Sequence, residues 1–370
     1  MIVNAEAHHD SILLIDDNAV LLDTLSSDLQ AHAKLAGVEI RKWIPTDDEG
    51  PPLNVFRSRI DSSTRLVVTD YDLTGKGRTG LFGPSIVEWC QALAIPVGDF
   101  SRGQQSLLPT RPNLFELRVP TQADEAPRFI VAAYLGFKRL REQLQTHPDL
   151  AAHGNLARVL ATLLGRPDAE SAFTLYMPRL ESANAAILDK IQAAHSEGAS
   201  QMGISKDVLL VYVLGHVLLN TILRYAGPIL SAQALCAYVA TTMDQLGLIA
   251  PAFSSAVYHG PFSEAGQWYW RKDVDALIEQ WSEKLQEPEF PSFGTFNCRA
   301  VETALGHELK RHSCDRCGGV NGGFYCPFTH RPVCERSDCS VVATSWIPQG
   351  AQLCRVERDF YEEWSPLLGL

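Results

Sequence analysis

The sequence lacks an apolar stretch long enough to cross a membrane. Its most apolar run, from Val208 to Leu223, is interrupted by His216 and soon followed by a Gly-Pro pair. A membrane-spanning helix requires about 20 apolar residues, so we expect a helix buried in a globular core. The N-terminal residues also lack a basic segment followed by an apolar core, so we expect no signal peptide and a cytoplasmic protein.

Positive charge is scarce as well. The chain has 32 Lys and Arg residues against 43 Asp and Glu residues, a formal net charge of -11, and no cluster of basic residues stands out. Proteins that bind nucleic acid neutralise its phosphates with a basic face, and a helix-turn-helix ordinarily has a basic recognition helix. We therefore expect partners that are proteins, with neither nucleic acid nor membrane among them; whether the chain forms an oligomer stays open.

Internal repeats and low-complexity tracts are absent. Hydrophobic residues make up 46% and charged residues 20% of the 370 residues, which is typical of a globular protein with a sizeable core. This length is enough for two or three domains. The nine cysteines of a chain in a reducing compartment indicate thiols or a metal site and not a disulfide framework.

Acidic residues follow two apolar segments in the N-terminal part. The segment from Ser11 to Ile15 precedes Asp16 and Asp17, and the segment from Leu66 to Val68 is soon followed by Asp70. Short apolar runs of this kind are typical of buried parallel strands, and ligands of open α/β sheets bind at the carboxyl ends of the strands. We therefore expect the three carboxylates to meet at one edge of a sheet.

Carboxylates gathered in this way repel one another unless a cation lies among them. Ligand sets made only of oxygen favour a hard ion such as Mg²⁺. The pattern thus predicts a magnesium site formed by Asp16, Asp17 and Asp70. The alternative is that these acids only cap the helices that follow the strands.

The motifs ILLIDDN and VVTDYDLTG, with a weaker match at IPVGDFSRG, resemble the receiver domain of bacterial two-component response regulators. The resemblance covers roughly residues 10–145 and implies a five-stranded, doubly wound α/β fold of the flavodoxin type. It implies that Asp70 accepts a phosphoryl group from a histidine kinase and that Asp16 and Asp17 help to hold Mg²⁺. It also implies that the hydroxyl of Ser101 reorients after phosphorylation. A carboxylate beside a bound cation can attack phosphorus.

The fifth strand departs from the family pattern. The family has a lysine directly before a proline at its end, whereas this chain has Arg118, Val119 and Pro120 in the segment LFELRVP. Arginine presents a planar fork where a compact ammonium group is expected. Two functions stay open: a phospho-acceptor regulator, not a turnover enzyme, that alters its contacts with a protein partner, and a degenerate receiver that serves as a docking scaffold.

The rest of the chain divides into a helical part and a cysteine-rich part. Helical patterns predict an all-α domain over residues 148–287, after the receiver-like domain of residues 1–147. A third functional alternative is an enzyme with its active site in this helical domain, where it would use His153 or His216. The alternatives are that His153 lies at the start of a helix and that His216 is a core histidine bonded to a neighbouring carbonyl group.

Residues 288–370 are predicted to form a small zinc-binding module that ends in a helix. The segment CDRCGGVNGGFYCPFTHRPVCERSDC begins with a CxxC knuckle. The predicted ligands are Cys314, Cys317, Cys334 and Cys339, with Cys326, His330 and His312 as alternates. Few core residues lie between the cysteines, so without metal the segment could not offset its ordering entropy. A closed shell of four thiolates predicts a structural zinc ion.

Overall fold

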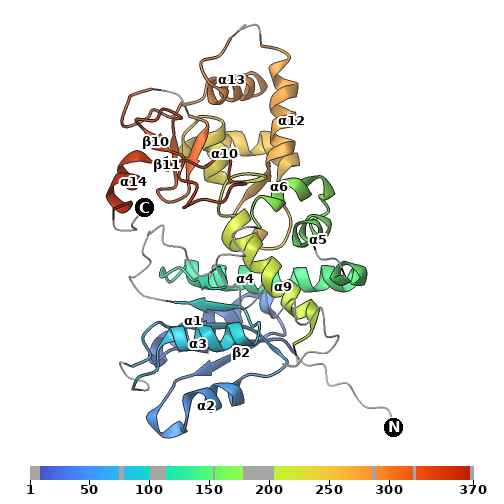
Figure 1. The fold of residues 1–370 in the computed structure, drawn as a ribbon, viewed down its shortest axis with the longest axis vertical. Coiled ribbons are helices and arrows are strands. Elements are labelled where there is room, and N and C mark those ends of the chain that lie inside the picture. The colour runs from blue at the N-terminus through green and yellow to red at the C-terminus, as the bar shows by residue number, and fades with distance from the viewer. Residues whose placement is uncertain are drawn as a thin grey trace. The chain divides into compact units, whose positions relative to one another are not determined.

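The computed structural model describes residues 9–74, 79–100, 114–152, 155–177, 204–285, 289–319 and 322–366. The chain folds into two compact units (Figure 1). Of the described residues, the first unit contains 9–74, 79–100, 115–151 and 204–216, and the second contains the remainder.

The first unit is built around a parallel sheet of five strands (Figure 1), in the order β2-β1-β3-β4-β5. The strands are β1 (Ser11–Ile15), β2 (Glu39–Trp43), β3 (Thr64–Thr69), β4 (Val97–Asp99) and β5 (Leu117–Arg118). Every residue of β1 and nearly every residue of β3 is buried, because the central strands of a parallel sheet are covered on both faces. A parallel sheet with helices, as predicted for an α/β region, is therefore confirmed.

One face of the sheet packs against two helices. The four helices that follow strands in this unit are α1 (Ala19–Ala31), α2 (Pro52–Arg59), α3 (Gly83–Ala92) and α4 (Glu125–Thr146). Leu13, Ile15 and Val67 share a core cluster with Phe56 of α2 and Ile86 of α3. Helices α2 and α3 therefore cover this face.

The opposite face lies under α1 and α4. Leu14 and Val68 line a cavity together with Leu21 of α1 and Ala126 of α4, since successive side chains of a strand point to opposite faces. Helix α1 begins after Asn18, whose side-chain oxygen accepts a hydrogen bond from the backbone N–H of Leu21 at 3.4 Å. This is the arrangement of an N-cap.

A further helix, α9 (Lys206–Val217), contributes residues 206–216 to the first unit. Tyr212 stacks on Phe115, with ring centroids 5.3 Å apart. Gly215 leaves room for Phe137, because a Cβ at this glycine would collide with the phenyl ring. These residues lie far beyond the predicted domain boundary at residue 147; the three-domain division itself stays a prediction. No described helix combines the length and the apolar character that a membrane span requires.

The second unit contains helices and three antiparallel pairs of strands. Its helices are α5 (Leu156–Leu163), α6 (Glu170–Thr174), a π-helical turn (Leu218–Ile222), α10 (Ala232–Tyr238), α11 (Leu246–Ile249), α12 (Arg271–Ser282), α13 (Phe293–Leu305) and α14 (Arg358–Trp364). The pairs are β6 (Ile229–Ser231) with β7 (Trp268–Trp270), β8 (Phe324–Cys326) with β9 (Arg331–Val333), and β10 (Ser340–Val341) with β11 (Val356–Glu357).

The prediction of an all-α segment over residues 148–287 is wrong in one respect, because β6 and β7 pair within it. Each strand has three residues, which is too few to show an alternating pattern in the sequence. The aromatic residues of the segment from Trp268 to Trp270 have a high strand preference, and this preference was the sequence signal for β7.

Helix α10 joins the helical and cysteine-rich parts of this unit. All its residues except Gln233 are buried, and it packs against β8 and β9. Just beyond the helix, the hydroxyl of Thr241 donates to the carbonyl oxygen of Lys310 at 2.7 Å. The cysteine-rich segment therefore shares a core with the helices before it.

Candidate functional site

The first candidate site lies at the carboxyl edge of the parallel sheet. Asp16 and Asp17 directly follow β1, and Asp70 directly follows β3. One carboxylate oxygen of each residue lies within 4.8 Å of those of the other two. Strands β1 and β3 are neighbours, with Ile15 beside Thr69, so the register of the sheet brings the acids together as the sequence predicts.

Hydrogen bonds hold the backbone at these acids. The N–H of Asp70 donates to the carbonyl oxygen of Ile15 at 2.9 Å, and the N–H of Asp16 donates to that of Trp43 at 3.3 Å. The Asp16 carboxylate accepts a hydrogen bond from the backbone N–H of Asn18 at 2.7 Å. Asp16 is only 7% exposed. Its carboxylate is therefore fixed in position, while Asp70 is less buried and can be reached from solvent.

A glycine at the start of α3 permits a close approach to Asp70. A Cβ at Gly83 would collide with the carbonyl oxygen of Asp70 and would lie 2.9 Å from the Cα of Tyr71. The N–H of Gly83 donates to the carbonyl oxygen of Tyr71 at 2.8 Å. The turn that carries Asp70 is thus held directly against the first residue of the helix.

A fourth acid, Asp99, ends β4 at the same edge of the sheet. Burial, together with the charges of Glu116 and Asp70, raises the pKa of Asp99 to about 7. Its Oδ1 atom is buried and finds no hydrogen-bond partner among the residues the structure describes. The sequence analysis selected Ser101 from this segment and missed Asp99, although an acid at the end of a short apolar strand was the signal that found Asp70.

Of the two other residues predicted for catalysis at this site, Arg118 is the one that the structure describes. Arg118 is the last residue of β5, is exposed, and lies beside Asp99 in the sheet register. Its catalytic role stays a prediction. Ser101 and His153 both lie outside the described residues.

His216 is a core residue of the first unit. Its side chain is completely buried, and the rings of Phe115, Phe137 and Tyr212 surround it. Its Nδ1 atom lies 2.7 Å from the carbonyl oxygen of Tyr212 and must carry the proton to donate to it. Burial lowers the pKa of His216 to about 4. The imidazole is therefore neutral, and the described side chains that surround it include no carboxylate with which to form a catalytic pair.

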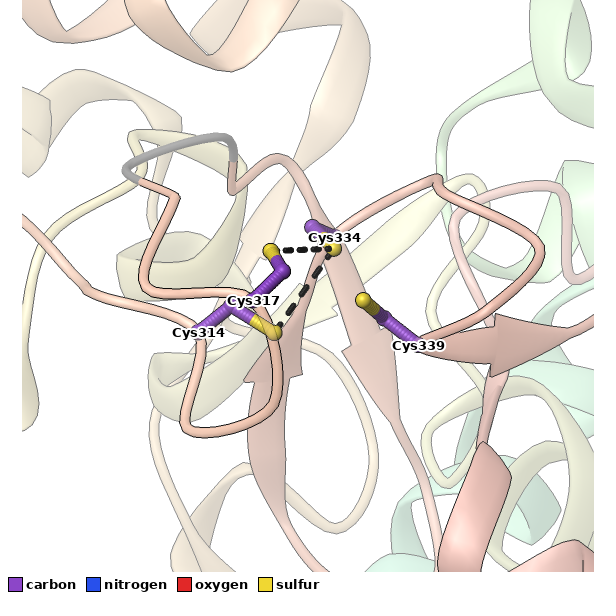
Figure 2. A group of neighbouring side chains, drawn as sticks. All are labelled: Cys314, Cys317, Cys334 and Cys339. Atoms are coloured by element: carbon purple, nitrogen blue, oxygen red, sulfur yellow. Dashed lines mark hydrogen bonds between the residues drawn. The ribbon is translucent and has the colours of Figure 1, made fainter.

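The second candidate site is a group of four cysteines in the second unit. Figure 2 shows the side chains of Cys314, Cys317, Cys334 and Cys339 directed towards a common centre, and their Sγ atoms all lie within 4.8 Å of one another. The Sγ of Cys334 lies 3.7 Å from that of Cys314 and 3.9 Å from that of Cys317. A disulfide requires about 2 Å, so the thiols are free. The four cysteines lie close enough to bind a metal ion.

A tight turn positions the first two of these cysteines. The N–H of Gly318 donates to the carbonyl oxygen of Cys314 at 2.8 Å, and Gly318 has a φ of 65°, which suits glycine. The N–H of Gly319 donates to the Sγ of Cys317 at 3.4 Å, and this bond lowers the pKa of the Cys317 thiol to about 7. The other two cysteines flank the loop between β9 and β10.

None of the three alternate ligands joins this group. The Sγ of Cys326 accepts a hydrogen bond from the backbone N–H of Glu357 at 3.5 Å. The Nδ1 of His330 lies 2.6 Å from the hydroxyl oxygen of Tyr325. His330 lies in the turn between β8 and β9, and its imidazole contacts Tyr325 of β8. His312 is mostly buried, which lowers its pKa. Sequence spacing alone could not separate these residues from the four ligand candidates.

A scan against models of protein families finds no match for this chain, and searches of curated proteins and of solved structures find none either. The geometry of the two sites is therefore the evidence for function. At the first site, this evidence is the sequence motifs and the placement of Asp16, Asp17 and Asp70.

Proposed function

We propose that the chain is a cytoplasmic signalling protein of the two-component type whose first unit accepts a phosphoryl group on Asp70. The observation that carries the proposal is the convergence of Asp16, Asp17 and Asp70 within 4.8 Å at the carboxyl edge of a parallel sheet. The strand order β2-β1-β3-β4-β5 supports a doubly wound, flavodoxin-like receiver fold. In such folds ligands bind where the strand order reverses, which is here between β1 and β3.

A divalent cation fits the donor set at this edge. Three carboxylates that approach one another so closely repel unless a positive charge offsets them, and oxygen-only ligands suit Mg²⁺. Asp16, Asp17 and Asp70 would hold the ion, with Asp16 already oriented by the N–H of Asn18. The bound ion would supply positive charge for the oxygens of the transferred phosphoryl group.

Asp70 is the acid best placed to act as the nucleophile. It is more accessible than Asp16, and its backbone is fixed by the hydrogen bond to Ile15 and by the contact with Gly83. A carboxylate oxygen of Asp70 forms the new O–P bond as the bond between phosphorus and the donor breaks, and the leaving group keeps the electron pair. The charge gained at Asp70 would then change contacts with a protein partner.

The alternative is a degenerate receiver that docks partners without accepting phosphate. Asp99 favours this alternative at pH values above its raised pKa of about 7, where the ionised carboxylate at the end of β4 would repel an incoming phosphoryl group. The planar guanidinium of Arg118, at the position where the family has a lysine, favours it too.

Incubation of the purified chain with acetyl phosphate and Mg²⁺ tests the proposal. We expect the intact mass to increase by one phosphoryl group, and we expect no increase for Asp70→Asn. Asp72→Asn is the matched control, because this neighbouring carboxylate is exposed and is occupied by the N–H and hydroxyl of Thr74. If the folded wild-type protein gains no mass, the proposal is overturned and the scaffold alternative is supported.

We propose in addition that the four cysteines hold a structural zinc ion. The Sγ separations of 3.7 Å and 3.9 Å agree with the edge of a tetrahedron whose Zn–S bonds are about 2.3 Å long, which is about 3.8 Å. Four thiolates fill the tetrahedron and leave no open position for a substrate, so the role is to stabilise the fold.

A further inference from the structure

The first unit contains a second cavity, at the amino edge of the sheet. Its volume is about 720 Å³, within the range of about 300–1,000 Å³ that is typical of small-molecule sites. The first residues of β3 and the residues just before β4 line it. Both strands begin at this edge of the sheet, which is opposite the edge that carries Asp70. Helices α2, α4 and α9 and the C-cap residue of α3 complete its walls.

Apolar side chains form much of the wall. The main ones are Leu93, Ile95, Phe137, Leu144, Val211 and Tyr212. They come from the end of α3, the segment before β4, and helices α4 and α9. Tyr212 is held in place by its stacking on Phe115. The cavity therefore offers an apolar surface to the body of a ligand.

Two arginines of the cavity share a single carboxylate. The Nε of Arg65 lies 2.7 Å from Asp10 Oδ1 and the Nη1 of Arg141 lies 3.5 Å from Asp10 Oδ2. Tyr134 donates its hydroxyl proton to the same carboxylate at 3.0 Å. The arginine side chains are 31% and 25% exposed. Among the residues that the structure describes, one carboxylate thus offsets two guanidinium charges, which leaves one positive charge in a partly desolvated place.

An additional anion would relieve this imbalance. Burial, and then the charge of Arg65, lowers the pKa of Arg141, as expected where a cation is desolvated beside another cation. Guanidinium groups also match carboxylate, sulfonate and phosphate groups through paired N–H donors. Both arginines line the cavity, so an anionic group that enters it can reach them.

The other charged residues of the cavity do not remove the positive charge at the pair. Arg57 adds a third cation, whereas Asp61 and Asp207 add acids. The Asp61 carboxylate is already engaged, because it accepts hydrogen bonds from Arg41 and from the N–H of Ser63, each at 2.8 Å. Asp207 is exposed on the first turn of α9. Among the described lining residues, Asp207 is therefore the acid that we expect to oppose an anionic ligand.

We propose that this cavity binds a small amphipathic anion, with its acidic group at Arg65 and Arg141 and its apolar body against the walls from α3, α4 and α9. The proposal does not depend on phosphorylation, because no residue of the Asp70 site lines the cavity. Since α9 forms one wall, the bound ligand also links this helix to the sheet.

Two fluorescent probes test the proposal on the full chain. We expect 8-anilinonaphthalene-1-sulfonate, an amphipathic anion, to bind saturably with one probe per chain. The uncharged analogue N-phenyl-1-naphthylamine should bind about tenfold more weakly, because it cannot pair with the arginines. Equal affinity for the two probes, or no saturable binding of the sulfonate, overturns the proposal. Competition by decanoate and by decyl phosphate then distinguishes a carboxylate ligand from a phosphate ligand.

Single substitutions test whether the sulfonate probe binds in this cavity. Arg141→Gln should weaken the sulfonate probe about tenfold and still fold, because Arg65 keeps its ion pair with Asp10. Arg128→Gln is the matched control, since this exposed arginine lies on the same helix and does not line the cavity. Asp207→Asn removes an exposed charge and should tighten binding two- to threefold. Wild-type affinity in both Arg141→Gln and Asp207→Asn would contradict the proposal even if other variants failed to fold.

Discussion

Differences in exposure divide the roles of the acids at the carboxyl edge. Asp16 is 7% exposed and accepts the N–H of Asn18, so it is suited to hold a cation in a fixed place. Asp70 is more accessible and is carried by a turn whose backbone is fixed, so it is suited to react. Asp99 differs from both, because burial and neighbouring acids raise its pKa to about 7.

The first prediction concerns Asp99. Because its folded pKa is about 7 and its unfolded pKa is near 3.9, the folded protein holds the proton more tightly. This acid therefore makes stability fall as the pH rises through this interval. Asp99→Asn should raise the free energy of unfolding by about 2 kcal/mol at pH 8 and have little effect near pH 4, after allowance for partial exposure.

Urea denaturation of the two proteins at pH 4 and pH 8, without added Mg²⁺, measures this difference. An equal effect of the substitution at both pH values would show that folding does not raise the pKa of Asp99, and would contradict the prediction.

The second prediction concerns Gly83. An added methyl group would collide with the carbonyl oxygen of Asp70, so the turn must shift and carry the carboxylate with it. Gly83→Ala should slow phosphorylation by acetyl phosphate about tenfold and lower the free energy of unfolding by about 1–3 kcal/mol. Ser85→Ala, two residues further along the same helix, is the control. A Gly83→Ala protein that is phosphorylated at the wild-type rate would show that the close approach does not position Asp70.

At the scale of elements, the ends of short strands and loops carry both sites. The acids follow β1 and β3, and two of the cysteines flank the loop between β9 and β10. The cysteine loops have few core residues of their own, whereas α10 packs against the β8–β9 hairpin beside them. The metal should therefore stabilise this hairpin and, through it, the second unit.

The third prediction follows for the zinc site. The protein as purified should contain one zinc ion per chain by elemental analysis, and Cys317→Ser should lose it. Loss of the metal should also lower the free energy of unfolding of the second unit by several kcal/mol, because metal binding and folding are coupled. Cys326 lies in the β8–β9 hairpin and is not one of the four predicted ligands, so the variant Cys326→Ala should keep its zinc. Zinc in Cys317→Ser at the wild-type level would refute the assignment of the four ligands.

The fourth prediction concerns the packing of α9 on the first unit. Burial lowers the pKa of His216 to about 4, whereas the unfolded value is near 6.5. Since the folded state disfavours the proton, the stability contributed by neutral His216 is complete above pH 6.5 and is lost as the pH falls towards 4. The loss should be about 3 kcal/mol.

The comparison of wild type with His216→Leu checks this effect of pH. The variant should show a smaller fall in unfolding free energy between pH 7 and pH 4.5. His147→Asn, which removes an exposed histidine, should retain the full fall. The same pH dependence in all three proteins would contradict the prediction.

For the whole molecule, the sequence predicted those elements whose signals are local. The strands before Asp16 and Asp70 were visible from apolar runs, and helix α14 was expected at the end of the zinc-binding module. The pairing of β6 with β7 was missed because each strand is three residues long. The place of α9 in the first unit depends on contacts with residues almost a hundred positions away, which no local pattern reveals.

The residues of the candidate sites also divide into those with a local sequence signal and those that only the tertiary structure reveals. The CxxC spacing and the acids after apolar strands are local signals, so both groups could be named from the sequence. Asp99 is the last residue of a strand of only three residues and was missed. The exclusion of Cys326 and His330 as ligands required the geometry of the hairpin. The amino-edge cavity needs α9 to complete it, so it could not be predicted without the tertiary structure.

The central claim is that Asp16, Asp17 and Asp70 together hold a divalent cation on which the chemistry at Asp70 depends. Calorimetric titration of Mg²⁺ into the purified wild-type chain and into Asp17→Asn and Asp70→Asn tests it most directly. The account predicts one Mg²⁺ per wild-type chain and binding at least about tenfold weaker in either variant. Folded wild-type protein that binds no Mg²⁺, or variants that bind it with wild-type affinity, would contradict the account.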